Sequence, residues 1–172
     1  MFHISQVDGV EPKEQLKISD LEPIEEAEKI KTDYMNREHL KIFEKVTNKA
    51  FYTPTFDYIE VPCREQYQNI EEFYSTLFHE MIHSTGHKNR LDRLETGASA
   101  HFGGESYSKE ELVAELGSAT LVNMLGIETE KGFRNSSAYI QNWLQALKND
   151  NKFIVSASSK AEKAVKYILN EQ

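Results

Sequence analysis

Residues 79–83 of the chain read His79-Glu80-Met81-Ile82-His83. On an α-helix, two histidines four positions apart project from the same face, close enough to bind one metal ion together. The glutamate after the first histidine then lies where its carboxylate can reach a metal-bound water molecule. Two neutral nitrogen ligands, an open coordination position and a nearby carboxylate are what a zinc peptidase requires. The segment therefore predicts a catalytic metal site.

The pattern around the motif predicts a helix that begins after Asn69 and ends near Gly86. Asn69 and Glu72 form a plausible capping pair, and glycine is a common helix stop. His79 and His83 lie on the arc opposite the apolar residues, so they are not predicted to be core histidines. The predicted core arc consists of Ile70, Phe73, Tyr74, Leu77, Phe78, Met81 and Ile82. For the pentapeptide alone, two solvated surface histidines remain an alternative.

A second predicted helix, residues 108–125, carries two carboxylates four positions apart, Glu111 and Glu115. Burying carboxylates without a cation or hydrogen-bond partners is costly, so they should have a partner. A metal on His79 and His83 is a suitable one. One carboxylate would complete a His2Glu ligand set and the other would orient a ligand from behind. The apolar residues that flank the pair on both sides are Leu112, Leu116 and Ala119, and Ala114, Leu121 and Leu125.

These segments also invite comparison with three other patterns. Ser108 and Glu111 also match a capping box, and Lys109 with Glu110 also fits a solvated helix entry. A three-histidine metal pattern would require a histidine at position 89, which is asparagine, while His87 is out of register. A glutamate from a separate helix is therefore the better third ligand.

Composition indicates one domain of ordinary globular character. The chain has 172 residues, of which 28% are charged and 39% hydrophobic. No apolar run reaches membrane-spanning length and no secretory leader opens the chain. The single cysteine, Cys63, fits a reducing cytosol, so we expect a cytoplasmic protein. The net charge of −8 argues against a nucleic-acid surface, although it equally suits a protein that mimics the charge of DNA.

The order of elements predicts an α+β fold, a small twisted sheet of about three strands packed with four to five helices. Residues 1–22 are polar and irregular and are predicted to be an N-terminal extension or linker before a domain of residues 23–172. The strand at 58–61 lies between Pro54 and Pro62, which favours an edge strand. The other expected elements are a short helix at 25–30, strands at 40–43 and 50–52, and helices at 137–148 and 156–169.

Nearly the whole chain resembles the zincin-like metallopeptidase domain of ArdC-type antirestriction proteins, TraC-like plasmid primases and polyvalent phage proteins. The segments that carry the resemblance are Ala50-Phe51-Tyr52-Thr53-Pro54, Asp57-Tyr58-Ile59-Glu60-Val61-Pro62, residues 74–87, Arg90-Leu91, Tyr107, Glu110-Glu111-Leu112-Val113-Ala114-Glu115-Leu116-Gly117, Ala138-Tyr139-Ile140, Trp143-Leu144 and Leu147-Lys148-Asn149-Asp150. The resemblance implies a zincin fold and a setting in phages or other mobile elements. In many members this domain follows a single-stranded-DNA-binding domain, which this sequence lacks, so DNA binding is not expected of the chain.

The resemblance also implies roles for the two carboxylates. Glu111-Leu112-Val113-Ala114-Glu115 is similar to the Glu-x-x-x-Asp element of gluzincins, in which the first acid binds zinc and the second supports a ligand histidine. By that match Glu111 is the third ligand and Glu115 its supporting neighbour. Glutamate replaces aspartate in the second position, and its longer side chain keeps Glu115 open as the alternative ligand.

The expected function is zinc-dependent hydrolysis of a peptide bond in a protein or peptide substrate, with one Zn²⁺ ion on His79, His83 and Glu111. Glu80 would take the proton of the attacking water and deliver it to the leaving amine. Tyr107 is the first candidate for stabilising the oxyanion, with His87 and His101 behind it. The alternative for Tyr107, an ordinary packing contact at the start of a helix, is the simpler interpretation of this residue.

Two alternatives remain open. A non-catalytic module could hold a structural zinc and use its acidic surface to engage a host protein. Glu80 favours the enzyme, because a structural site has no use for a free carboxylate beside the metal. In the second alternative the pentapeptide is coincidental and the chain is a metal-free helical partner of a larger polypeptide.

Overall fold

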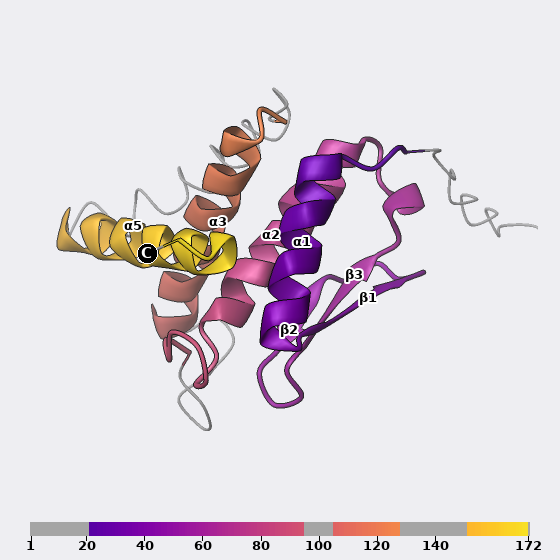
Figure 1. The fold of residues 1–172 in the computed structure, drawn as a ribbon. Helices are drawn as coiled ribbons and strands as arrows, with labels where there is room; N and C mark the ends of the chain where they lie inside the picture. Colours follow the sequence, from indigo (N-terminus) through magenta and orange to yellow (C-terminus); the bar gives the residue numbers. More distant parts are fainter. Residues whose placement is uncertain (1–20, 95–104, 128–150, 172) are drawn as a thin grey trace, which may run out of the picture.

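The computed structural model describes residues 21–94, 105–127 and 151–171, and the side chains of 105–108 and 151 are outside the description. The described part confirms the predicted α+β class, with three strands and four α-helices (Figure 1). The elements are α1 (Glu25–Glu38), β1 (Lys41–Lys45), β2 (Phe51–Thr53), β3 (Tyr58–Pro62), the 3₁₀ turn η2 (Arg64–Gln66), α2 (Ile70–Thr85), α3 (Glu105–Met124) and α5 (Asn151–Leu169). The helix expected at 137–148 lies outside the described residues, as do Tyr139 and Trp143.

The three strands form one mixed sheet in the order β1-β3-β2. β3 pairs in parallel with β1 and antiparallel with β2, so that Ile59 is opposite both Ile42 and Tyr52. The expectation that residues 58–61 form an edge strand is therefore wrong. Pro54 lies in the turn after β2 and Pro62 is the last residue of β3, so neither proline removes a donor from the middle of the ladder.

One face of the sheet covers α2, and α2 in turn packs against α3 (Figure 1). The burial of β3 alternates, with Ile59 and Val61 fully buried toward the core, as expected for a strand with one face on a helix. α5 packs against α3 and also contacts α2 and α1. The motif helix is thus the central element of the fold, which explains why so much of its surface is apolar.

α1 is longer than the expected helix at 25–30 and continues to Glu38. Its later turns are stabilised by tertiary contacts. Tyr34 is fully buried and its hydroxyl lies 2.9 Å from Ser84 Oγ of α2. Lys31 forms ion pairs with Glu28 at 2.6 Å and with Glu44 of β1 at 3.3 Å. Because these contacts connect residues far apart in the sequence, the local sequence pattern predicted too short a helix.

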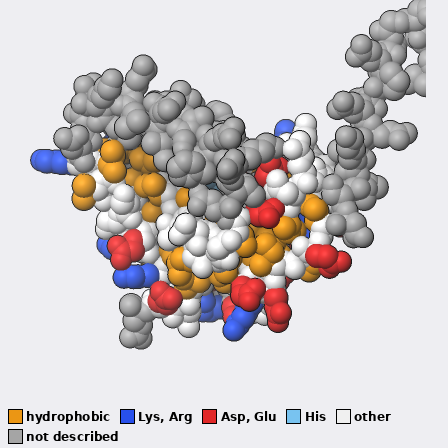
Figure 2. Space-filling model, turned by 90° about the horizontal axis from the view of Figure 1, so that it is seen from above, with side chains coloured by type: hydrophobic (Ala, Val, Ile, Leu, Met, Phe, Trp, Pro, Cys, Tyr) orange, Lys and Arg blue, Asp and Glu red, His pale blue; other side chains and the backbone are white. Residues whose placement is uncertain are grey.

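The described surface carries charges of both signs. Figure 2 shows acidic and basic side chains interspersed beside hydrophobic ones on the face seen from above. None of the helices in the described ranges combines the length and hydrophobicity that a membrane span requires.

Candidate metal centre

α2 presents the two motif histidines because its ends and its core face form as the sequence predicted. Asn69 caps the helix, with its Oδ1 accepting a hydrogen bond from the backbone N–H of Glu72 at 2.9 Å, and Gly86 is the C-cap residue. The predicted core arc is fully buried apart from Ile70, which is half-buried. His79 and His83 face α3, with side chains 18% and 14% exposed, so they are not free surface histidines.

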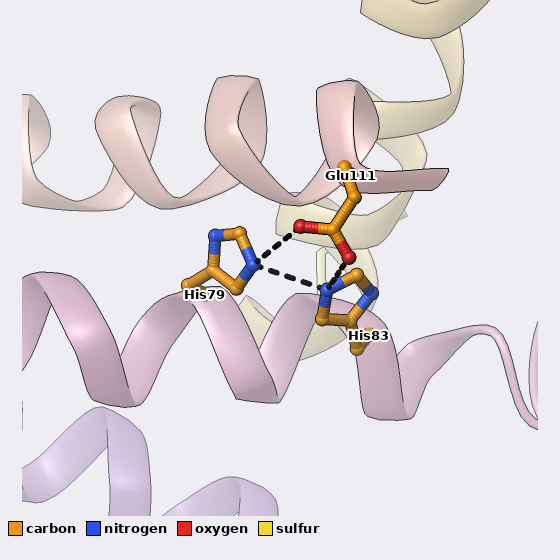
Figure 3. A group of neighbouring side chains, drawn as sticks. All are labelled: His79, His83 and Glu111. Carbon is orange, nitrogen blue, oxygen red and sulfur yellow. Dashed lines mark hydrogen bonds and ion pairs between the residues drawn. The ribbon is translucent and has the colours of Figure 1, made fainter. Parts of the chain in front are cut away.

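Three predicted ligands meet between α2 and α3 (Figure 3). The Nε2 atoms of His79 and His83 lie 3.1 Å apart. Glu111 places Oε2 at 3.6 Å from Nε2 of His79 and Oε1 at 3.4 Å from Nε2 of His83. One ligand atom from each residue lies within 4.8 Å of the others, an arrangement that one cation can bridge. Two imidazoles and a carboxylate suit zinc and other first-row divalent ions, so the residues present fit such a metal.

Close packing of the two helices brings Glu111 to the histidines. Gly117 of α3 lies against Ile82 of α2, and Ser118 Oγ donates a hydrogen bond to the carbonyl of Ser75 at 2.8 Å. α3 begins at Glu105, before Ser108, so a capping box that starts at Ser108 is excluded as the role of Glu111. The predicted partner helix is confirmed and begins one turn earlier than expected.

The two neighbouring glutamates contact the outer nitrogens of the histidines. Oε1 of Glu115 lies 3.4 Å from Nδ1 of His79, and Oε1 of Glu110 lies 3.4 Å from Nδ1 of His83. Glu111 alone of the three faces both Nε2 atoms. This arrangement agrees with Glu111 as third ligand and Glu115 as a supporting residue, assignments that remain predictions.

The expectation that Glu110 belongs to a solvated helix entry is wrong. Its side chain is only 14% exposed and forms a two-point ion pair with Arg93, through Nη2 at 2.7 Å and Nε at 2.9 Å. No sequence spacing connects position 93 with position 110, because their proximity depends on how the segment after α2 folds back. The acidic run at 110–111 was the one available signal.

Burial and the ion pairs shift the pKa values of the site in opposite directions. Burial raises the pKa of Glu111, but His79 and His83 outweigh this effect and hold it well below its usual range. Burial lowers the pKa of His83, whereas its contacts with Glu110 and Glu111 raise it to about 10. These opposite shifts reflect the pairing of His83 with the carboxylates of Glu110 and Glu111.

Glu80 lies on the other flank of the motif and is 7% exposed. Burial raises the pKa of its carboxyl group, and the nearby His83 and His79 counter only part of the shift. The backbone of Tyr52 in β2 also interacts with this carboxyl group. A buried carboxyl group with a raised pKa, next to His79 in the chain, is a candidate for a general base.

The candidates for oxyanion stabilisation are only partly described. Tyr107 belongs to α3, one turn before Glu111, but its side chain lies outside the described residues, and so does all of His101. His87 is buried in the turn after α2, where its Nδ1 accepts a hydrogen bond from the backbone N–H of Asn89 at 3.3 Å. His87 thus has a local structural role.

Comparison with known proteins assigns the class. Residues 28–160 match the family described as zincin-like metallopeptidases. The chain belongs to this family, and the resemblance predicted from its motifs is confirmed.

Two relatives with similar sequences show which proteins contain such a domain. The chain is 35% identical over 170 residues to DNA primase TraC of Escherichia coli, covering 98% of this chain and 11% of that protein. It is 31% identical over 173 residues to the uncharacterised protein y4eC of Sinorhizobium fredii (strain NBRC 101917 / NGR234), covering all of this chain and 53% of that protein.

Two crystal structures of the antirestriction protein ArdC from plasmid R388 share the fold. The Mn(II)-bound structure matches with a TM-score of 0.71 at 34% identity, over 96% of this chain and 58% of that one. The metal-free structure matches with a TM-score of 0.66 at 33% identity, over 99% and 60%. The chain thus spans less than two thirds of the length of these relatives, from 11% to 60%.

Proposed function

We propose that the chain is a metal-dependent peptidase domain that hydrolyses a peptide bond of a protein substrate. The observation that carries the proposal is the convergence of His79, His83 and Glu111 within 4.8 Å, with the buried Glu80 beside them. We propose Zn²⁺ as the ion, because two imidazoles and one carboxylate are a common catalytic zinc set. Mn(II), which is bound in the ArdC structure, is the second candidate. Such an ion supplies an acidified water molecule and polarises the scissile carbonyl.

Residues of the chain would bind the ion and transfer the proton. His79 and His83 present Nε2 atoms, and Glu111 completes the cation site. Glu80 accepts the proton of the attacking water and then donates it to the leaving amine, a role that its raised pKa supports. Removal of such a general base typically costs about 10²–10⁴-fold in rate.

β2 is the strand we propose for substrate binding, in place of residues 58–61. β3 is paired on both sides, whereas only one side of β2 is paired within the described sheet. Tyr52 of β2 also interacts through its backbone with Glu80, so this edge borders the candidate site. An extended peptide can add to such an edge through main-chain hydrogen bonds. Its scissile bond would then lie close to the Glu80 carboxylate.

Tyr107 remains our candidate for the oxyanion donor. It precedes Glu111 by one turn of α3, so its position along the helix is suitable. Replacing Tyr107 with Phe is expected to lower kcat about 10²–10³-fold with metal affinity unchanged, since one oxyanion donor has effects of this size. A variant with full kcat would leave Tyr107 with a packing role only.

The relatives suggest the biological setting. Their names include a DNA primase and an antirestriction protein. We propose that this domain acts in the cytoplasm on a protein, in an antirestriction-type context, and that it makes no direct contact with nucleic acid. The net charge of −8 supports the last point.

The decisive experiment compares the wild-type chain with Glu80→Gln, a change that removes the base and keeps its shape. Elemental analysis should find about one metal ion per chain in both proteins. Cleavage of an unstructured protein such as casein should occur only with the wild type. Equal cleavage by both proteins would refute the peptidase mechanism. An antirestriction effect that survives Glu80→Gln in cells would favour the non-catalytic binding module instead.

A further inference from the structure

The carboxylate of Glu110 contacts the outer ring nitrogen of His83 and is itself bound by Arg93. Oε1 of Glu110 lies 3.4 Å from Nδ1 of His83, the ring nitrogen that does not face His79. Both oxygens of Glu110 are bound by Arg93, Oε1 by Nη2 at 2.7 Å and Oε2 by Nε at 2.9 Å. A two-point pair of this kind restricts both the position and the rotation of the carboxylate.

Arg93 is anchored in turn to the end of the motif helix. Its Nη2 donates to the carbonyl oxygen of Ile82 at 2.8 Å, and its Nη1 donates to Thr85 Oγ1 at 3.0 Å. All three guanidinium nitrogens therefore have partners, and the side chain is only 7% exposed. Glu110 of α3 therefore contacts α2 directly at His83, and indirectly through Arg93, which binds Ile82 and Thr85 of α2.

Gly86 allows the segment that carries Arg93 to approach α2. The backbone N–H groups of Arg93 and Leu94 both donate to the carbonyl oxygen of Gly86 at 2.9 Å. A Cβ at position 86 would lie 2.8 Å from Cγ of Leu94 and 3.3 Å from Nη2 of Arg93. Glycine is thus required by the close approach of this segment and not by its backbone angle, which is helical.

The second histidine lacks this support among the described residues. Glu115 lies 3.4 Å from Nδ1 of His79, but its side chain is 25% exposed and forms no ion pair with an arginine or lysine in the described ranges. The two histidines therefore differ in how firmly their outer nitrogens are held.

We propose that Glu110 and Arg93 are positioning residues of the metal centre, which hold His83 with its Nε2 directed at His79 and Glu111. The inference rests on the proposed metal centre. A carboxylate on Nδ1 selects the tautomer whose proton is on Nδ1 and whose lone pair is on Nε2, the form that binds a metal. Arg93 holds that carboxylate in place through its two hydrogen bonds.

The test measures Zn²⁺ affinity by competition with a chromogenic chelator, using the purified full chain. Glu110→Gln and Arg93→Lys are expected to raise the Kd about 10- to 100-fold, as loss of a supporting residue typically does. The Co²⁺-loaded variants should also show an altered visible absorption spectrum, because the ligand ring is reoriented. Glu162→Gln is the matched control: its carboxylate is 66% exposed on α5, and its Kd should equal that of the wild type.

A purely structural role predicts a different result. Then the melting temperature of the metal-free variants would fall, while the Kd of the folded protein and the Co²⁺ spectrum would stay as in the wild type. That result would overturn the inference. If Glu110→Gln does not fold, Arg93→Lys decides by the same criteria, because lysine retains the charge but not the two-point contact. Absence of Zn²⁺ binding by the wild type would overturn the metal centre itself, whereas tight binding without hydrolysis would overturn only the peptidase.

Discussion

Ile82 of α2 lies directly against Gly117 of α3, where the two helices that carry the candidate metal ligands meet. A Cβ at position 117 would lie 2.6 Å from Cδ1 and 2.8 Å from Cγ1 of Ile82, whose side chain is fully buried. The absence of a side chain at 117 therefore permits the separation at which Glu111 reaches His79 and His83.

Gly117→Ala is expected to destabilise the fold by about 1–3 kcal/mol, since overpacking a buried contact has this cost. It should also weaken metal binding, because α3 carries Glu111. Urea unfolding and a Zn²⁺ titration would measure the two effects. Ile82→Ala removes the three carbons that a Cβ at 117 would approach, Cδ1, Cγ1 and Cγ2, at its own cost of about 2–5 kcal/mol. In that background the penalty of Gly117→Ala should shrink, and a strictly additive pair would argue against the contact.

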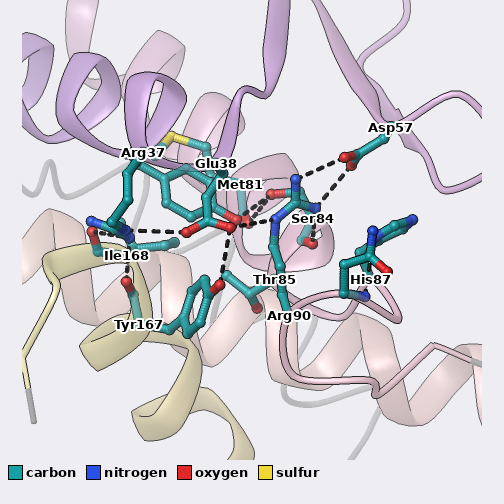
Figure 4. Close-up of polar contacts among 12 residues, drawn as sticks. Arg37, Glu38, Asp57, Met81, Ser84, Thr85, His87, Arg90, Tyr167 and Ile168 are labelled. Carbon is teal, nitrogen blue, oxygen red and sulfur yellow. Dashed lines mark hydrogen bonds and ion pairs between the residues drawn. The ribbon is translucent and has the colours of Figure 1, made fainter.

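Asp57 and Arg90 form a partly buried ion pair that joins the β2–β3 turn to the segment after α2 (Figure 4). Arg90 donates to both oxygens of Asp57 at 2.8 Å and also to Glu38 of α1, which accepts a further bond from Tyr167 of α5. Burial raises the pKa of Asp57, but hydrogen bonds from Arg90 and Tyr52 outweigh this and hold it below its usual value of 3.8.

Asp57→Asn is expected to lower the free energy of unfolding by about 1–2 kcal/mol at pH 7, a value reduced for partial exposure. The folded pKa is depressed, so the stabilisation from Asp57 is complete above pH 3.8 and is lost as pH falls through the folded value. Asparagine tolerates the positive φ of 50° at this position, so the change isolates the charge. Urea unfolding at pH 7 and at pH 3 measures the difference, which should narrow at low pH. A constant difference would contradict the prediction.

Metal removal should destabilise the chain. A ligand at 100 times its Kd adds about 2.7 kcal/mol, which corresponds to about 5–10 °C in Tm for a chain of this size. A strong chelator should lower the Tm of the wild type by that amount. His79→Ala should melt at the same temperature with and without metal. An unchanged wild-type Tm after chelation, verified by elemental analysis, would be evidence against the site.

Asn69→Ala is expected to cost about 1 kcal/mol, because it removes the side-chain acceptor for the N–H of Glu72 at the start of α2. Asn69→Ser keeps an acceptor and should retain most of the stability. Thermal and urea unfolding of both variants would show the difference. Equal losses in the two would indicate that Asn69 acts by other contacts.

Local sequence pattern was sufficient for the features that depend on neighbours along the chain. The cap at Asn69, the core face of α2, the shared face of His79 and His83, and the helix that carries Glu111 were all predictable. Each follows from helical periodicity or from the hydrogen bonds of one turn.

Pairing between distant segments was decided by the tertiary structure. Proline positions suggested that residues 58–61 form an edge strand, yet β3 is the middle strand. Pro54 precedes β3 and Pro62 is its last residue, so the N–H groups in the middle of the strand can still form hydrogen bonds to both neighbouring strands. Likewise, only the packed helices show that Glu110 meets both His83 and Arg93.

The sequence by itself thus determined the residues capable of metal chemistry and the helices that carry them. The tertiary structure decided which carboxylate faces which ring nitrogen, since this depends on the separation of α2 and α3 at Gly117 and on the return of the chain at Gly86. The physical reason is range: periodicity and capping act within a few residues, whereas contacts between side chains far apart in sequence form only when the core packs.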